Sequence, residues 1–182
     1  MTVTGSMVSR LIVLRGNSAA GKSTVSQLVR EKVGPGLAVI EQDHVRRTVL
    51  SEQDRTDSVN IGLIDTMARF CLDSGFDVLI EGILDSDRYG TMLRQLTQDH
   101  RGIAGHYYLD VPLAVTLVRH KTRAKATEFD ATKMQSWYRP RDVLPGLAQK
   151  VIDQTLTAEE IAQMIFEDLG SPDGRSRPAT AI

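Results

Sequence analysis

The residues GNSAAGKS (16–23) fit the pattern G-x-x-x-x-G-K-[S/T] in full, and their neighbours supply the context that this pattern requires. The preceding run LIVLRG (11–16) is apolar and ends in glycine, which predicts a buried strand. Apolar side chains then recur at helical spacing, at Val25, Leu28, Val29 and Val33. The sequence therefore predicts a strand, a phosphate-binding loop and a helix in that order. The alternative is a glycine-rich turn that matches the pattern by chance.

The predicted loop binds a nucleoside triphosphate with its backbone and its last side chains. Glycines let backbone N–H groups turn inward around phosphate oxygens, and the helix N-terminus adds a favourable dipole. Lys22 is expected to act as a catalytic cation on the β- and γ-phosphates, Ser23 to hold Mg²⁺, and Thr24 to contact the α-phosphate. The predicted nucleotide-binding residues of this segment are Gly16, Asn17, Ser18, Ala19, Ala20, Gly21, Lys22, Ser23 and Thr24.

Apolar runs and helical patterns alternate along the rest of the chain. Strands are predicted at 11–16, 37–43, 77–84, 102–111 and 149–154, and helices at 22–33, 59–74, 87–100, from 112 onward and at 157–170. This alternation predicts an α/β fold, with a parallel sheet covered by helices on both faces. In such folds, ligands bind outside the carboxyl ends of the strands.

A chain of 182 residues has the length of one domain, which we place at residues 11–170. Residues 1–10 are expected to form a flexible leader, and residues 171–182 a disordered tail. The polar segment at about 121–145 lacks a long apolar period and is the candidate for a mobile lid. The polar residues 51–58 are expected to form a surface connection.

Composition and charge narrow the classes of partner and compartment. The formal net charge of −1 gives no general attraction to polyanions, so nucleic acid is disfavoured as a partner. No apolar run approaches the ~20 residues that span a bilayer, and the N-terminus lacks the pattern of an export signal. The single cysteine, Cys71, fits a reducing compartment. We therefore expect a cytoplasmic protein with no membrane partner, and the sequence leaves its oligomeric state open.

A carboxylate, Asp43, ends the second predicted strand, and Arg46 follows three residues later. A carboxylate in this place can take the proton of an attacking hydroxyl, so Asp43 is the candidate general base and a ligand of the acceptor. Arg46 is a candidate ligand of an anionic acceptor or of the transferring phosphoryl group. The alternative is that Asp43 caps the following helix, a common position for aspartate.

Another carboxylate, Glu81, interrupts the apolar strand VLIEGIL (78–84). A carboxylate is costly to bury without a cation, so we expect Glu81 to lie near Mg²⁺ or the acceptor. The alternative is a side chain that local backbone donors satisfy. Asp85 and Asp87 follow, either lining the acceptor site or forming a solvated turn.

Arginines in and near the predicted lid are candidates for stabilising charge in the transition state. Arg119 and Arg123 are four residues apart on one helical face, so both can point across the nucleotide. We assign Arg123 a catalytic role on the γ-phosphoryl oxygens and Arg119 a role in nucleotide binding. Arg139, in WYRPRD (137–142), is a candidate substrate ligand when the lid closes. A solvated basic helix face is the alternative.

These motifs resemble those of the small P-loop kinases, the group that contains zeta toxins, chloramphenicol phosphotransferase, and gluconate and adenylylsulfate kinases. QDHVRR (42–47) looks like the D-x-x-R element of that group, whose aspartate is the general base. LIEG (79–82) is similar to a strand whose glutamate contacts substrate or metal, and Arg119 and Arg123 look like paired lid arginines. The resemblance implies a three-layer fold with sheet order 2-3-1-4-5, a helical lid, and ATP with Mg²⁺. It does not imply the acceptor.

Three functional hypotheses follow. The leading one is an ATP-dependent kinase that transfers the γ-phosphoryl group to a hydroxyl of a small molecule, such as a metabolite, antibiotic, nucleoside or nucleotide sugar. Arg46 and the basic lid leave a nucleotide kinase or polynucleotide 5′-hydroxyl kinase as an alternative. A nucleotide-dependent switch, or an ATPase without a hydroxyl acceptor, is the second alternative. The sequence lacks the N-K-x-D element of guanine-specific switches.

Overall fold

The computed structural model describes residues 3–121 and 131–170, in which strands and helices alternate. The strands are β1 (Arg10–Gly16), β2 (Leu37–Glu41), β3 (Asp77–Gly82), β4 (Ile103–Asp110) and β5 (Lys150–Asp153). The helices are α1 (Lys22–Val33), α2 (Gln42–His44), α3 (Val59–Asp73), α4 (Ser86–Asp99), α5 (Leu113–Lys121), α6 (Ala131–Trp137) and α7 (Ala158–Asp168). A π-helical turn, η1 (Val45–Val49), continues α2.

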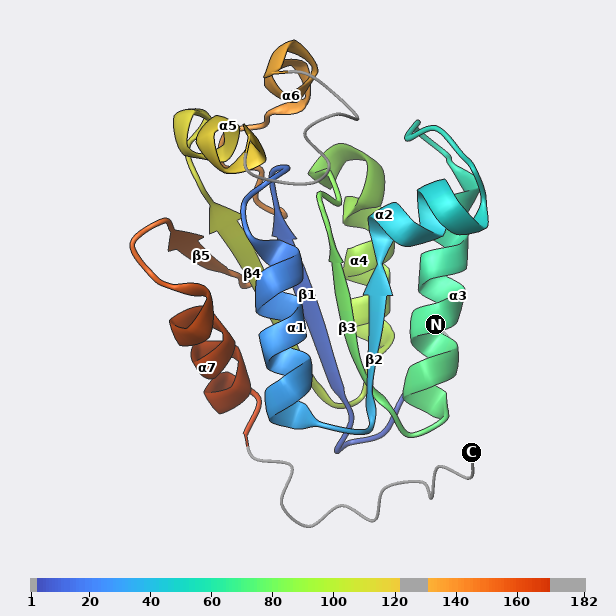
Figure 1. Ribbon diagram of the computed structural model, residues 1–182. Helices are drawn as coiled ribbons and strands as arrows, with labels where there is room; N and C mark the ends of the chain where they lie inside the picture. Colours follow the sequence, from blue (N-terminus) through green and yellow to red (C-terminus); the bar gives the residue numbers. More distant parts are fainter. Residues whose placement is uncertain (1–2, 122–130, 171–182) are drawn as a thin grey trace.

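The strands form one parallel sheet in the order β2-β3-β1-β4-β5, so the predicted α/β class and the implied 2-3-1-4-5 order are confirmed. β1 occupies the centre of the sheet (Figure 1), between β3 and β4. The loop after β1 therefore opens at the carboxyl edge, beside the point where the strand order reverses. Within residues 3–121 and 131–170, no helix has the length and apolar character that crossing a membrane requires.

Two apolar clusters hold helices against opposite faces of the sheet. Successive residues of a strand point to opposite faces, and β1 supplies both clusters in this way. Ile12 and Leu14 pack with side chains of α1 and α7, whereas Leu11 and Val13 pack with side chains of α3 and α4. Figure 1 shows α1 and α7 side by side on one face of the sheet. The three-layer arrangement thus follows from the apolar stretch 11–14 of β1, which contributes side chains to both clusters.

The structure differs from the expected boundaries at β2 and at the leader. β2 ends at Glu41 rather than at Asp43, so Asp43 lies in the first turn of α2. Residues 3–10 do not extend as a flexible leader. Thr4 is buried, donates a 2.9 Å hydrogen bond from Oγ1 to Asp73 Oδ1, and forms a parallel bridge with His100. These polar contacts hold residues 3–10 against the rest of the protein, although their sequence contains few apolar residues that would predict such packing.

The structure describes only part of the predicted lid. Helices α5 and α6 lie above the carboxyl ends of the strands (Figure 1), and α6 falls within the segment of about 121–145 that is predicted as a lid. The first part of that segment, residues 122–130, and the whole predicted disordered tail, residues 171–182, lie outside the described residues.

A buried histidine on β4, His106, gives the fold a specific weakness in acid. Burial, and secondarily the positive charge of Arg15, lowers the pKa of His106 from 6.5 to about 4. This pKa lies below that of a histidine in the unfolded chain. The neutral His106 therefore makes its full contribution to the unfolding free energy above pH ~6.5, and this contribution is lost as the pH drops toward 4. From pH ~7 to ~4.5, we expect the unfolding free energy to fall by about 2 kcal/mol more in the wild type than in His106→Gln. Urea denaturation at both pH values measures this difference, and equal losses would contradict it.

Candidate functional site

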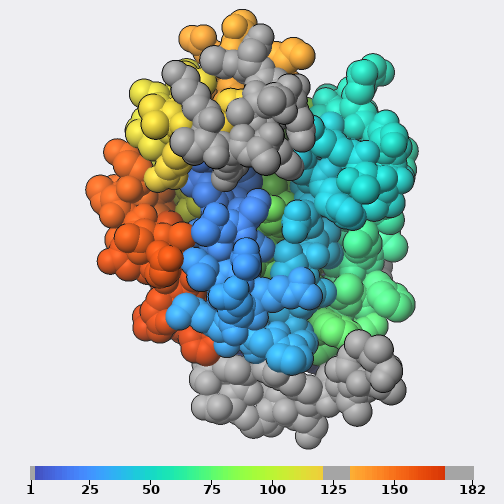
Figure 2. Space-filling view, viewed as in Figure 1, coloured from blue at the N-terminus to red at the C-terminus, as the bar shows by residue number. Residues whose placement is uncertain are grey.

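A cavity of about 900 Å³ opens at the carboxyl ends of the strands. Its walls come from the loop after β1, from α2 and η1, from residues 53–56, from the start of α4 and from α6. The space-filling view shows α1 exposed between α7 and the segment after β2 (Figure 2). Predicted site residues that line the cavity are Ser18, Ala19, Lys22, Ser23, Asp43, Arg46, Glu81 and Arg139.

The backbone between Gly16 and Lys22 turns tightly enough to form an anion-binding concavity. Gly16 has a φ of 149°, and a Cβ built on it would lie 2.8 Å from the Leu109 carbonyl oxygen, so only glycine fits. Gly21, with φ 107°, is the N-cap of α1, and Ala19 also adopts the left-handed region. Positive φ values in a tight turn at a helix N-terminus are typical of the loops whose backbone N–H groups bind phosphate.

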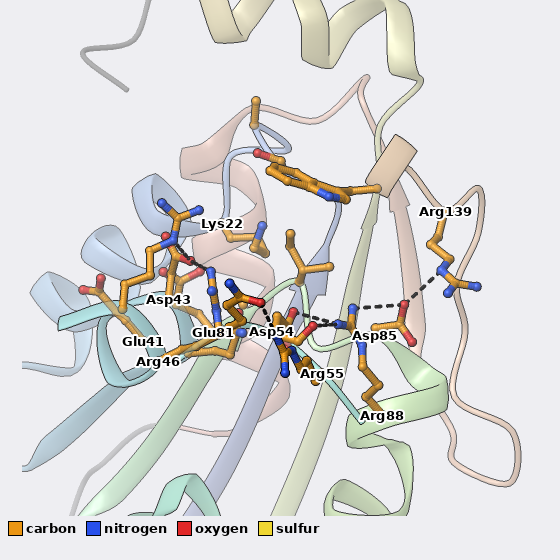
Figure 3. Close-up of a pocket in the computed structure, with 18 of the residues that line it drawn as sticks. Lys22, Glu41, Asp43, Arg46, Asp54, Arg55, Glu81, Asp85, Arg88 and Arg139 are labelled. Atoms are coloured by element: carbon orange, nitrogen blue, oxygen red, sulfur yellow. Dashed lines mark hydrogen bonds and ion pairs between the residues drawn. The ribbon is translucent and has the colours of Figure 1, made fainter. Parts of the chain in front are cut away.

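Lys22, Ser23 and Glu81 form the centre of the site. Lys22 is buried, and its Nζ donates to the Asn17 carbonyl at 3.0 Å. Ser23 Oγ donates to Glu81 Oε1 at 3.1 Å. Burial raises the pKa of the Glu81 carboxyl, while the Lys22 ammonium and the Ser23 hydroxyl act in the opposite direction. The Glu81 carboxylate is therefore stabilised by the Lys22 ammonium and by the Ser23 hydroxyl of the loop (Figure 3), rather than by local backbone donors.

The Ser23 hydroxyl and the Glu81 carboxylate fit a divalent cation of the hard type. Mg²⁺ prefers oxygen ligands and is commonly held by one or two protein groups together with substrate phosphates and water. The described residues contain no cluster of three or more His, Cys, Asp or Glu side chains that could hold a metal by themselves. A Mg²⁺ ion in this place would therefore be coordinated by oxygen atoms of the nucleotide as well as by Ser23 and Glu81.

Asp43 is held on the cavity wall by two guanidinium groups. Its Oδ1 lies 2.8 Å from Arg46 Nη2 and 2.8 Å from Arg47 Nε. The N-cap of α2 is Glu41, and Asp43 follows it within the first turn. Arg46 and Arg47 belong to the π-helical turn η1, a local irregularity that is common at functional sites. Asp43 is thus a half-exposed carboxylate with fixed orientation, opposite the phosphate-binding loop.

The Asn17 side chain connects the phosphate-binding loop to the segment after α6. Its Nδ2 donates to the Arg139 carbonyl at 2.8 Å, and its Oδ1 accepts from the Arg139 N–H at 2.9 Å. Asn17 is buried, and the Arg139 guanidinium extends away to Asp85, 2.9 Å from Nε to Oδ2. One hydrogen-bonded path therefore runs from the loop to the far wall of the cavity.

Truncating this connection is expected to destabilise the protein. Asn17→Ala removes both hydrogen bonds to Arg139 and leaves the Arg139 N–H without its acceptor, while the Arg139 carbonyl keeps its 3.2 Å bond from the Tyr108 hydroxyl, at a cost of about 2 kcal/mol in total. For a domain of this size, that loss lowers the melting temperature by roughly 4–8 °C. Asn17→Asp keeps the acceptor for the Arg139 N–H but places a buried carboxylate oxygen against the Arg139 carbonyl oxygen, so we expect a loss at least as large as in Asn17→Ala. An unchanged melting temperature in Asn17→Ala would contradict the assigned contacts.

Among the predicted arginines, Arg119 lies beside the loop. Its Nη1 donates to the Ala20 carbonyl at 3.0 Å, which places the guanidinium against the predicted nucleotide site. Arg123, the predicted catalytic cation, lies outside the described residues. Thr24 is exposed in the first turn of α1, where its hydroxyl is open to a ligand.

An internal ion pair, Arg15 with Asp142, was missed by sequence reasoning. Arg15 is buried at the end of β1, and its Nη2 lies 2.7 Å from Asp142 Oδ2, while its Nε donates to the Leu84 carbonyl at 2.8 Å. Asp142 also accepts from the Ser86 N–H at 2.9 Å. The pair fixes the segment after α6 to the carboxyl end of β1. The sequence did contain an indication of this ion pair, because Arg15 is a charged residue within the otherwise apolar run LIVLRG.

The connection at 51–58 is a wall of the cavity rather than a surface connection alone. Asp54 and Arg55 line the cavity together with Asp85 and Arg88. The buried Tyr89 hydroxyl secures the connection, because it donates to Asp54 Oδ1 at 2.9 Å. The polar composition of residues 51–58 predicts that they are exposed. Nothing in their local sequence indicates that they contact Arg88 and Tyr89 of α4.

A family model, AAA_33, described as an AAA domain, matches residues 11–144. No curated protein matches the sequence. The segment that the model covers runs from β1 through the phosphate-binding loop, Asp43 and Glu81 to the residues after α6.

Solved structures of two kinases and of an antibiotic resistance protein share the fold at low sequence identity. The APS kinase of Mycobacterium tuberculosis, in complex with AMPPNP and APS, superposes with a TM-score of 0.68 at 20% identity, over 92% of this chain and 98% of that one. A gluconokinase from Sinorhizobium meliloti gives 0.63 at 19% identity, over 93% of both chains. The tunicamycin resistance protein of Deinococcus radiodurans gives 0.58 at 18% identity, over 90% and 96%. These similarities show a common fold.

Proposed function

The chain belongs to the AAA_33 family of AAA domains, and from this membership and the cavity we propose an ATP-dependent kinase that phosphorylates a hydroxyl of a small molecule. One observation carries the proposal. Asp43 lines the same cavity as Lys22, so a carboxylate that can accept a proton faces the phosphate-binding loop. A loop of this kind serves a switch equally well, and the opposing carboxylate favours transfer.

The donor half binds ATP with the loop backbone, Lys22 and Arg119. The N–H groups of the turn take the phosphate oxygens, and the Lys22 ammonium stabilises negative charge that develops on the β- and γ-phosphates. Ser23 and Glu81 would hold Mg²⁺, which neutralises charge on the phosphates when it is bound. The APS kinase of similar fold was solved with AMPPNP, which supports a nucleotide in this half.

The acceptor half places one hydroxyl between Asp43 and the γ-phosphorus. The hydroxyl proton passes to the Asp43 carboxylate as the hydroxyl oxygen bonds to that phosphorus. The bond from the γ-phosphorus to the bridging oxygen of the β-phosphate breaks, and ADP leaves with the electron pair. Arg46 and Arg47 keep Asp43 oriented before the step, since both are hydrogen-bonded to its Oδ1. Positioning and electrostatics supply the catalysis.

A screen of hydroxylated metabolites, antibiotics, nucleosides and nucleotide sugars with Mg²⁺ and ATP tests this proposal. ADP release should rise in the presence of the true acceptor. Steady ATP hydrolysis that no hydroxyl compound stimulates would favour the ATPase alternative. A salt-dependent gel shift of an oligonucleotide, together with its 5′-phosphorylation, would favour the polynucleotide kinase instead.

A further inference from the structure

The far wall of the cavity carries equal numbers of carboxylates and guanidinium groups. Among the described residues, Asp54, Asp85 and Asp87 face Arg55, Arg88 and Arg139 there, and we call this set the paired wall. Its formal charge is zero, three negative against three positive. Figure 3 shows two of its members, Asp85 and Arg139, apart from Lys22 and Asp43.

Ion pairs bind two of the three guanidinium groups to the carboxylates. Arg139 lies 2.9 Å from Asp85 Oδ2 and 3.4 Å from Asp87 Oδ2. Arg88 lies 3.1 Å from Asp54 Oδ2 and 3.5 Å from Asp85 Oδ2. Arg55 donates to the side-chain oxygen of Gln53 at 2.6 Å. The positive charge that would attract an anionic acceptor is therefore largely neutralised by the carboxylates of the wall.

Asp85 is the centre of this arrangement and cannot easily be displaced. It is 3% exposed, and while Oδ2 faces the two arginines, Oδ1 accepts the Asp87 N–H as the N-cap of α4. An anion that drew Arg88 and Arg139 away would leave a buried carboxylate without its cations, which is strongly unfavourable. The wall consequently resists an anionic ligand.

The other side of the cavity is also balanced in formal charge among the described residues, because Lys22, Arg46 and Arg47 lie there with Glu41, Asp43 and Glu81. Arg46 and Arg47 both contact Asp43 Oδ1 on that side. The difference between the two sides is the phosphate-binding loop, whose backbone N–H groups at a helix N-terminus suit an anion. The paired wall has no such loop, so the donor side and the acceptor side differ in backbone geometry rather than in net side-chain charge.

A hydroxyl group suits the paired wall because it both donates and accepts hydrogen bonds. Neighbouring hydroxyls can donate to carboxylate oxygens and accept from guanidinium N–H groups without breaking an ion pair. Trp137, 44% exposed on the same cavity, offers a flat apolar surface to the carbon face of a ring. Resting on the proposed kinase function, we propose that the acceptor is an uncharged polyhydroxylated molecule of the sugar or polyol class, bound by the paired wall.

Matched acceptors test this proposal directly. Glucitol and gluconate differ at one end by a hydroxymethyl or a carboxylate, and glucose and glucose 6-phosphate by a phosphate. With wild-type protein and Mg²⁺-ATP, we expect kcat/KM for the neutral member of a pair to exceed that of the anion by about tenfold or more. A preference for the anionic member would overturn the proposal.

Sulfate binding tests the wall independently of catalysis. In protein saturated with Mg²⁺-ADP, calorimetry should show sulfate binding about tenfold tighter in Asp85→Asn than in the wild type, because the change frees Arg139 and Arg88. Asparagine still caps α4. Asp87→Asn should act in the same direction and is the second variant if the first does not fold. Equal sulfate affinity in wild type and variants would overturn the wall. A protein that binds Mg²⁺-ADP but phosphorylates no compound contradicts the kinase function instead.

Discussion

Replacing Lys22 with alanine is expected to lower the rate of phosphoryl transfer by about a hundred- to a thousandfold. The Lys22 ammonium is buried beside the loop and lies near Glu81. Its charge lowers the pKa of the Glu81 carboxyl, which burial raises. In the transition state it stabilises the negative charge that grows on the phosphoryl oxygens. The initial rate of ADP formation at saturating ATP and acceptor measures the effect.

A second lysine on the same helix provides the control. Lys32 lies near the other end of α1, on the surface, where its Nζ donates to Gln163 Oε1 at 2.9 Å. Lys32→Ala should keep the wild-type rate, because its charge is remote from the cavity. A Lys22→Ala protein that melts cooperatively, yet turns over within a few-fold of the wild type, would remove Lys22 from the mechanism.

Asp43→Asn is expected to lower kcat by about a hundred- to ten-thousandfold, with the Kd for ATP nearly unchanged. The amide keeps the size of the side chain but cannot take a proton from the attacking hydroxyl. Nucleotide binding is expected to persist, because the loop, Lys22 and Arg119 are untouched. Rapid-quench measurement of phosphorylated acceptor separates this chemical step from ATP binding.

Asp57→Asn is the matched control for the change at Asp43. Asp57 is exposed in the 51–58 connection and has a φ of 61°, a value that asparagine also tolerates. Its replacement should leave kcat unaltered. Normal turnover by Asp43→Asn with the true acceptor would eliminate Asp43 as the base. The loss of its ion pairs with Arg46 and Arg47 is checked by the melting temperature of the same variant.

The layers of the fold could be predicted from the sequence because local patterns and burial agree. Residues 11–14 are apolar on both faces, as a central strand of a covered parallel sheet must be, and Thr157 with Glu160 forms a capping box at the start of α7. The end of β2 could not be placed as accurately. Gln42 and Asp43 can continue a strand or begin a helix, and buried contacts of Gln42 with Tyr89 select the helix.

The donor half of the site could also be located from the sequence, because its residues are contiguous in one motif. On the acceptor side the sequence indicated only single candidates such as Asp43 and Arg139, and it could not show the ion pairs of the paired wall, because their partners are distant in the chain. Asp54 meets Arg88 across 34 residues, and Asp85 meets Arg139 across 54. Such pairs leave no periodicity, and each partner alone reads as an ordinary surface charge. Only the folded chain shows that they form one wall.

The most direct test of the central claim is the mass of the products that wild-type protein makes from γ-labelled ATP, Mg²⁺ and a sugar or polyol acceptor. We predict that the γ-phosphoryl label appears on a hydroxyl of the acceptor, in amounts equal to the ADP released, and that Asp43→Asn abolishes this product. Recovery of all the label as free inorganic phosphate, at the same rate with or without acceptor, would contradict the account.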